Sequence, residues 1–121
     1  EEYLGIRPET DAEGCLQDIH WSHGNIGYFP TYSLGSAMAA QLYAAAEESI
    51  ADLDSQIAAG SFDKIREWLQ TNIHQHGARY ETNELIKQAT GSSFTADAFV
   101  SYVTEKYGSL YNLDQDFHVA K

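Results

Sequence analysis

The side chains best suited to chemistry lie in one short stretch, residues 14–32. Gly24, Gly27 and Pro30 prevent a continuous helix through it. A structural segment repeats apolar residues at a regular period, whereas this one mixes hydrogen-bond donors, acceptors and rings on a bent backbone, which is typical of a site. Its polar and aromatic side chains include Gln17, Asp18, His20, Trp21, His23, Tyr28 and Tyr32.

Imidazole and phenol groups can donate hydrogen bonds to negative charge that develops on a reacting substrate. Tyr28 and Tyr32 are four residues apart, so they share a face if a helix begins between them, and Pro30 suits the first turn of such a helix. We expect at least one of these phenols to face a cleft. The alternative is that both are packing aromatics, and the sequence does not distinguish the two tyrosines.

Helices are expected to position this stretch. Residues 32–50 follow a helical apolar stripe and are rich in alanine, which predicts a central helix. Residues 51–59 continue it or form a second helix, which Gly60 closes. The predicted inward residues of the central stripe are Leu34, Met38, Leu42, Ala45, Ala46 and Ile50.

Three further helices follow from capping signals. Ser61 is expected to cap a helix that carries Phe62 inward and ends by residue 77, and Thr82 a shorter one that residue 91 ends. Thr95 is expected to cap the last helix, which Gly108 ends. Residues 111–121 show no clear period, and no segment alternates with a period of two. The fold class is therefore predicted to be all-α, with four to five helices.

Composition narrows the function classes. Eighteen acidic and seven basic residues give a formal net charge of −11, which repels nucleic-acid phosphates and anionic membranes. No apolar run approaches the ~20 residues that span a bilayer. The single cysteine, Cys15, fits a reducing compartment. We expect a soluble, cytoplasmic chain that binds neither nucleic acid nor membrane.

Residues 14–21 read G-C-L-Q-D-I-H-W, which resembles the G-x-x-Q-D-x-H-W motif of the thermostable, Taq-type zinc metallocarboxypeptidases. The segment G-Y-F-P-T-Y-S-L-G at residues 27–35 looks like the same family's next segment. The pattern W-L at residues 68–69, followed by I-H-Q-H-G at residues 73–77 and Tyr80, is also similar to that family. The resemblance extends over residues 3–111.

The resemblance implies a larger, mostly helical zincin-type peptidase of which this chain is the C-terminal part. Members of that family bind zinc through an H-E-x-x-H helix, and that pattern is missing from these 121 residues. The fragment is therefore expected to bind no metal and to be inactive alone, with zinc or another divalent metal held elsewhere in the full-length enzyme. Residues 1–33 would form an entry and active-site-wall segment and residues 34–121 a helical C-terminal region, together one partial domain.

The resemblance also suggests roles for single residues. His20, Tyr28 and Tyr32 would be catalytic, as hydrogen-bond donors to the oxyanion; the alternative for His20 is a hydrogen bond inside its own loop. Supporting or substrate-binding roles would fall to Gln17, Asp18, Trp21 and Arg79. Their alternatives are turn capping for the first two, packing for the indole, and an ordinary exposed arginine. His74 and His76 are read as structural or surface histidines because no further ligand lies near them in the sequence.

The resemblance predicts an enzyme that removes single residues from peptide C-termini. Its partners would be peptide substrates, the missing N-terminal part and, because an isolated helical segment exposes apolar surface, a second copy in a homo-oligomer. The alternative is a stand-alone acidic helical protein-interaction module without catalytic activity.

Overall fold

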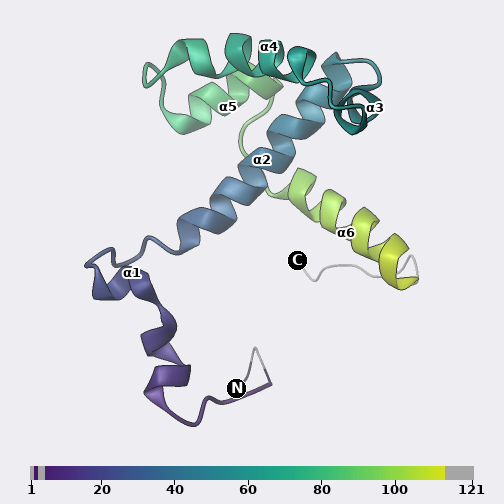
Figure 1. Ribbon diagram of the computed structural model, residues 1–121. Helices are drawn as coiled ribbons and strands as arrows, with labels where there is room; N and C mark the ends of the chain where they lie inside the picture. Colours follow the sequence, from purple (N-terminus) through teal and green to yellow (C-terminus); the bar gives the residue numbers. More distant parts are fainter. Residues whose placement is uncertain (1, 3–4, 114–121) are drawn as a thin grey trace. The chain divides into compact units, whose positions relative to one another are not determined.

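A computed structural model of the chain describes residues 2 and 5–113 (Figure 1). Every regular element in this part is helical, which confirms the all-α prediction. The α-helices are α1 (Ile19–Ser22), α2 (Pro30–Ser49), α3 (Leu53–Ala58), α4 (Asp63–Asn72), α5 (Thr82–Thr90) and α6 (Asp97–Tyr111). Three short 3₁₀ helices are η1 (Asp11–Glu13), η2 (Cys15–Gln17) and η3 (His74–His76). Residues 114–121 of the aperiodic tail lie outside the described residues.

The chain divides into two compact units, Glu1–Ser33 (unit 1) and Leu34–Lys121 (unit 2). Unit 1 contains η1, η2, α1 and the first turn of α2. Gly24 and Gly27 both have φ of 78°, in the left-handed region that favours glycine, so the chain can turn sharply between α1 and α2. Pro30 is the first residue of α2, where its missing N–H costs no hydrogen bond.

In unit 2, α3, α4 and α5 gather at one end of α2, and α6 leaves from near its middle (Figure 1). The buried residues of α2 are Ala37, Gln41 and Ala46. The predicted stripe was therefore partly wrong, because Leu34 is 51% exposed. The connection between α5 and α6 lies against the side of α2 that carries Gln41. Leu34 lies on nearly the same side, because seven residues make almost two helical turns, but it is about 10 Å earlier along the helix, in its first part.

Gln41 fastens α2 to the connection between α5 and α6. Its Nε2 lies 2.9 Å from Ser92 Oγ, 3.1 Å from the Ser93 carbonyl and 3.3 Å from Thr90 Oγ1. Its Oε1 accepts from the Thr95 N–H at 3.1 Å. The side chain is only 7% exposed, so a buried amide makes bonds in both directions between segments distant in sequence.

The predicted starts of α4 and α5 were each wrong by one residue. Phe62, and not Ser61, is the N-cap of α4, and Phe62 is 57% exposed where we expected it inward. Ser61 instead helps to close α3, because its N–H donates to the Gln56 carbonyl at 2.9 Å beside the left-handed Gly60. Thr82 is the first residue of α5 rather than its cap.

The last helix starts one residue later than expected and also ends later. Ala96, and not Thr95, is the N-cap of α6, although the Asp97 N–H donates to Thr95 Oγ1 at 3.2 Å. The predicted end at Gly108 was wrong, since α6 runs to Tyr111. Asn112, with φ of 50°, takes the left-handed conformation that terminates the helix, and its N–H donates to the Gly108 carbonyl.

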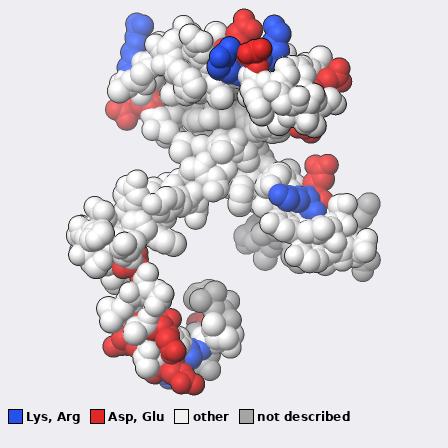
Figure 2. All heavy atoms as spheres, viewed as in Figure 1, with Lys and Arg blue, Asp and Glu red and all other residues white. Residues whose placement is uncertain are grey.

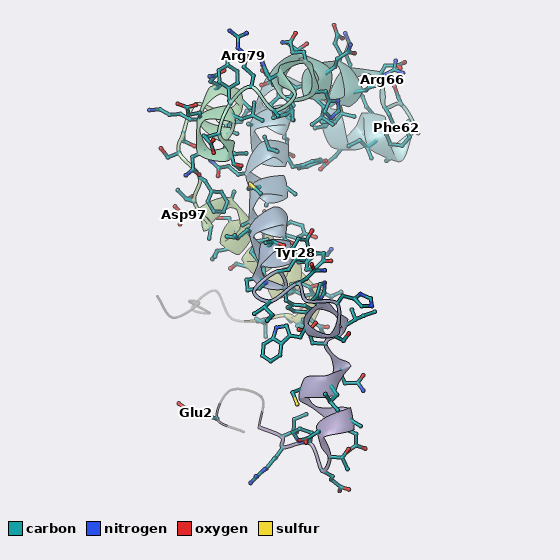
Figure 3. The ribbon with its side chains drawn as sticks, turned by 90° about the vertical axis from the view of Figure 1, so that its left-hand side faces the viewer. Glu2, Tyr28, Phe62, Arg66, Arg79 and Asp97 are labelled. Carbon is teal, nitrogen blue, oxygen red and sulfur yellow. The ribbon has the colours of Figure 1, made fainter. Side chains whose placement is uncertain are left out.

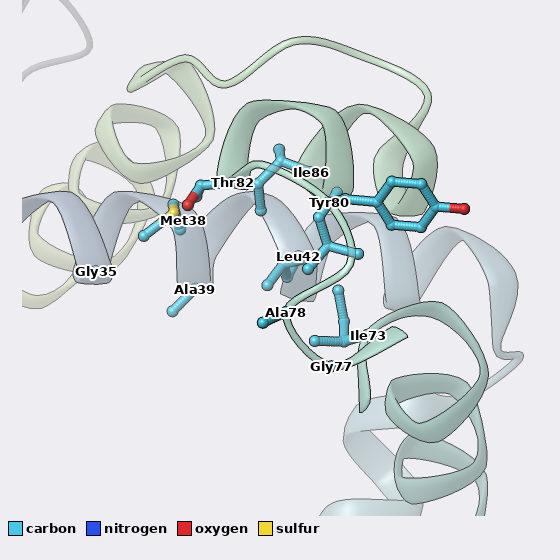
Figure 4. Close-up of a pocket in the computed structure, with 11 residues that line it drawn as sticks. Gly35, Met38, Ala39, Leu42, Ile73, Gly77, Ala78, Tyr80, Thr82 and Ile86 are labelled. Atoms are coloured by element: carbon cyan, nitrogen blue, oxygen red, sulfur yellow. The ribbon is translucent and has the colours of Figure 1, made fainter. Parts of the chain in front are cut away.

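The core is small. Among the described residues, the buried apolar side chains are Ala37, Ala46, Leu53 and Ile86. An apolar hollow of about 540 Å³ opens in unit 2 between α2, α5 and the segment that precedes α5 (Figure 4). On the face drawn in Figure 2, the middle of α2 is uncharged, and acidic and basic side chains gather over α4 and α5. No helix in the described part of the chain is long and apolar enough to cross a membrane.

Candidate active site

Asp18 holds His20 at two points. Asp18 has an extended backbone and is the N-cap of α1, and its Oδ1 accepts from the His20 backbone N–H at 2.9 Å. The same Oδ1 lies 2.7 Å from His20 Nδ1. Because one oxygen bonds both the backbone and the ring, the aspartate fixes the start of α1 and the orientation of the imidazole together.

These contacts also decide which ring nitrogen carries the proton. The His20 backbone N–H, and after it the imidazole hydrogen bond, lower the pKa of Asp18 below its usual value. An ionised carboxylate only accepts hydrogen bonds, so Nδ1 must be protonated. The neutral imidazole then has an unprotonated Nε2, which can accept a hydrogen bond.

Tyr32 is the hydrogen-bond partner of that second nitrogen. Its Oη lies 3.2 Å from His20 Nε2. With Nδ1 protonated, the phenol is the donor in this contact and the neutral ring the acceptor. Asp18, His20 and Tyr32 therefore form a directed hydrogen-bond chain from the first turn of α2 to the cap of α1.

Three rings surround the imidazole, and together with it they form an aromatic cluster of His20, Tyr28, Phe29 and Tyr32. Tyr28 stacks on His20 with centroids 5.6 Å apart and planes 25° apart. Phe29 and Tyr32 approach it edge-on, at 5.4 and 5.5 Å. Tyr28 and Tyr32 also meet edge-on at 5.7 Å, a favourable aromatic geometry.

The cluster is open to solvent. The exposed fractions of Tyr28, Phe29 and Tyr32 are 51%, 60% and 56%, while the His20 side chain is 15% exposed. Tyr28 lies just before the first turn of α2 (Figure 3). The imidazole is thus shielded by rings that themselves remain accessible, which suits a site more than a core.

Phe29 was missed by the sequence reasoning. It contacts both His20 and Tyr32, so it helps to fix the imidazole. The available signal was its place between two candidate phenols and directly before Pro30. A ring at that position must lie at the start of the helix, beside the same turn as Tyr32.

The remaining predicted residues lie in other surroundings. The Gln17 side-chain amide donates to the Ala12 carbonyl, which is a local bond across the turn between η1 and η2. Trp21 is 61% exposed. Arg79 belongs to unit 2, where its guanidinium lies 5.5 Å from the Tyr80 ring centroid and its side chain extends outward (Figure 3).

The described residues do not fit a metal site. They contain no group of three or more His, Cys, Asp or Glu side chains that would hold a metal ion. His74 and His76 both lie in η3, and the His76 ring meets the Tyr80 ring edge-on at 5.4 Å. The chemistry that these residues offer is hydrogen bonding and aromatic contact.

The family described as carboxypeptidase Taq (M32) metallopeptidase matches residues 1–107, and the chain belongs to that family. The sequence resemblance is thereby confirmed.

The relatives are much longer than this chain. It is 49% identical over 107 residues to thermostable carboxypeptidase 1 of Pyrococcus furiosus, covering 88% of this chain and 21% of the relative. It is 43% identical over 113 residues to carboxypeptidase 1 of Bacillus subtilis, covering 93% and 23%. The crystal structure of the M32 carboxypeptidase from Deinococcus radiodurans matches with a TM-score of 0.87 and 41% identity, over 93% of this chain and 23% of that one. The chain thus spans roughly a fifth of the length of the curated relatives it matches.

Proposed function

We propose that this chain is one wall of the active site of a metallocarboxypeptidase that removes single residues from peptide C-termini. The observation that carries the proposal is the hydrogen-bonded and stacked arrangement of Asp18, His20, Tyr28 and Tyr32 inside the segment that matches the family. In this proposal the cluster faces the scissile carbonyl of the bound peptide.

The contribution of the cluster is electrostatic. When water adds to a peptide carbonyl, negative charge develops on its oxygen, and donors already held in place stabilise that charge without reorganising. A phenol of the cluster is such a donor, and Asp18 and the surrounding rings hold the imidazole in place. The described residues do not fit a metal, so in this proposal the divalent metal implied by the family name, which we take to be zinc, is held by residues outside this chain.

The proposal also covers the rest of the enzyme, its assembly and its compartment. Residues outside this chain would complete the enzyme, so the 121-residue chain alone would be inactive. Its small core and exposed side chains such as Phe62 (57%) and Leu110 (63%) leave apolar surface for that part or for a second copy. The single free thiol, the exposed Cys15, supports a reducing compartment such as the cytoplasm.

The function is tested with a chimera. Residues 1–107 of this chain, which match the family, replace the corresponding segment of the Pyrococcus furiosus relative. We expect the chimera to release C-terminal amino acids from short peptides and the isolated chain to release none. A well-folded chimera without carboxypeptidase activity, in this host and in the Bacillus subtilis relative, would contradict the proposal.

The second candidate is an acidic helical interaction module. The net charge of −11 and the small core favour it, because a surface with exposed apolar groups among acids suits a protein partner. The same chimera separates the two functions, since an interaction module has no reason to support peptide hydrolysis when it replaces an enzyme's wall.

A further inference from the structure

The sequence leaves open which tyrosine meets the substrate, and the structure separates them. Resting on the proposed function, we propose that Tyr28 is the catalytic residue that donates to the developing oxyanion, whereas Tyr32 is a positioning residue that holds His20.

Tyr32 is committed to the imidazole. The Asp18 carboxylate requires the proton on Nδ1, so neutral His20 presents a lone pair at Nε2, and Tyr32 Oη at 3.2 Å supplies the hydrogen for it. A phenol has one hydrogen. While Tyr32 donates that hydrogen to the ring, it has none to donate to a substrate oxygen.

Tyr28 contacts His20 with a different part of its side chain than Tyr32 does. It uses its ring face, stacked at 5.6 Å with planes 25° apart, and not its hydroxyl. Among residues 2 and 5–113, no protein group forms a hydrogen bond with the Tyr28 hydroxyl. The side chain is 51% exposed, so that hydroxyl is accessible to a ligand. The stacking fixes the direction of the phenol while its hydrogen stays available.

The assignment of Tyr32 depends on Asp18. If Nε2 carried the proton instead, the ring would donate to Tyr32 and the Tyr32 hydrogen would be available, so both phenols could donate to a substrate. The 2.7 Å contact between Asp18 Oδ1 and His20 Nδ1 excludes that tautomer for the neutral ring. The protonation of one nitrogen thus decides whether Tyr32 is available as a donor, and the hydroxyl of Tyr28 is available in either case.

The first test reads the tautomer in the 121-residue chain itself. Long-range ¹H–¹⁵N NMR, with His20 assigned by the His20→Gln variant, should show a protonated Nδ1 and an unprotonated Nε2 at neutral pH. Tyr32→Phe should shift the Nε2 resonance because it removes the donor, while Tyr28→Phe should leave the tautomer unchanged. A protonated Nε2, or a Nε2 resonance that does not respond to Tyr32→Phe, would overturn the role of Tyr32.

The second test measures kinetics in the active chimera. Tyr28→Phe should lower kcat by about a hundredfold or more with little change in KM, because it removes a donor used in the transition state. Tyr32→Phe should lower kcat by roughly tenfold or less and change the shape of the pH–kcat profile, because it acts through His20. Tyr102→Phe, at a tyrosine 49% exposed on α6, is the matched control and should leave kcat unchanged.

A larger loss for Tyr32→Phe than for Tyr28→Phe, or equal losses, would overturn the division of roles. Failure of this division of roles can be distinguished from failure of the proposed function. If the unmutated chimera is folded but inactive, the function fails and the assignment of Tyr28 fails with it. The NMR measurement still decides whether Tyr32 holds His20, because it requires no activity.

Discussion

Gln41 offers the sharpest test of how the helices of unit 2 are held together. Replacing it by leucine keeps the side-chain volume close to that of glutamine and removes its polar atoms. The amide has two hydrogens for three acceptors, so two of its donated bonds, at 2.9 and 3.1 Å, are the main ones, and the Thr95 N–H bond is a third. At about 1 kcal/mol net for each bond, and with the Thr95 N–H losing its acceptor, Gln41→Leu should cost about 2–4 kcal/mol.

Urea denaturation followed by circular dichroism measures this loss as a change in the free energy of unfolding. Gln88→Leu is the matched control because Gln88 is exposed on α5, and it should change stability by no more than about 0.5 kcal/mol. A Gln41→Leu variant that stays within about 0.5 kcal/mol of the wild type, with an unchanged m-value, would refute the reasoning that this buried amide fastens α2.

Three further predictions concern other contacts. Leu53 is 2% exposed, so Leu53→Ala should lower the free energy of unfolding by about 2–5 kcal/mol in the same urea assay. The pKa of Asp18 is lowered, so its contact with His20 stabilises the folded state above the ordinary carboxyl value of 3.8 and is lost as pH falls through the lower folded value. In an acid titration by NMR the His20 resonances should therefore report this loss in the wild type and not in Asp18→Asn. The hydrogen bond to Asp54 raises the pKa of Tyr43 from 10.0 to about 12. The stability that this hydrogen bond contributes is therefore fully present below pH 10.0 and is lost as the pH rises through about 12. Asp54→Asn should bring one phenol back toward the ordinary range in an ultraviolet titration.

The helical class and the bends before α2 could be predicted from the sequence because both depend on local signals. Pro30 marks the start of α2, and the turn glycines separate it from α1. The closing residues Gly60 and Gly91 adopt φ of 75° and 78°, as their positions after helices indicated. These features need no knowledge of distant parts of the chain.

The errors arose where tertiary contacts decide the outcome. Gln41 carries no periodic apolar signal, and its burial follows from partners about fifty residues away in the sequence, such as Ser92 and Ser93. Leu34 fits the helical period and shares a side of α2 with the buried Gln41, yet it lies almost two turns earlier along the helix and is 51% exposed. Gly108 has a low helix propensity, yet α6 continues past it because Asn112 takes the terminating conformation.

The candidate site was predictable as a set of residue types and not as a geometry. The sequence suggested His20, Tyr28 and Tyr32 together, and the structure brings them into contact. The roles of these residues remain a prediction. Which phenol contacts Nε2, and that Phe29 closes the other side, depends on side-chain directions at the first turn of α2, which spacing alone does not determine.

The most direct test of the account is kcat of the His20→Ala chimera, measured by release of the C-terminal residue from a peptide and compared with the unmutated chimera. We predict a fall of about a hundredfold, with an unchanged melting temperature, because the variant removes the ring on which the Tyr28 phenol stacks and a small misplacement of a catalytic group can cost that much. A kcat equal to that of the unmutated chimera would show that the cluster does not serve the reaction.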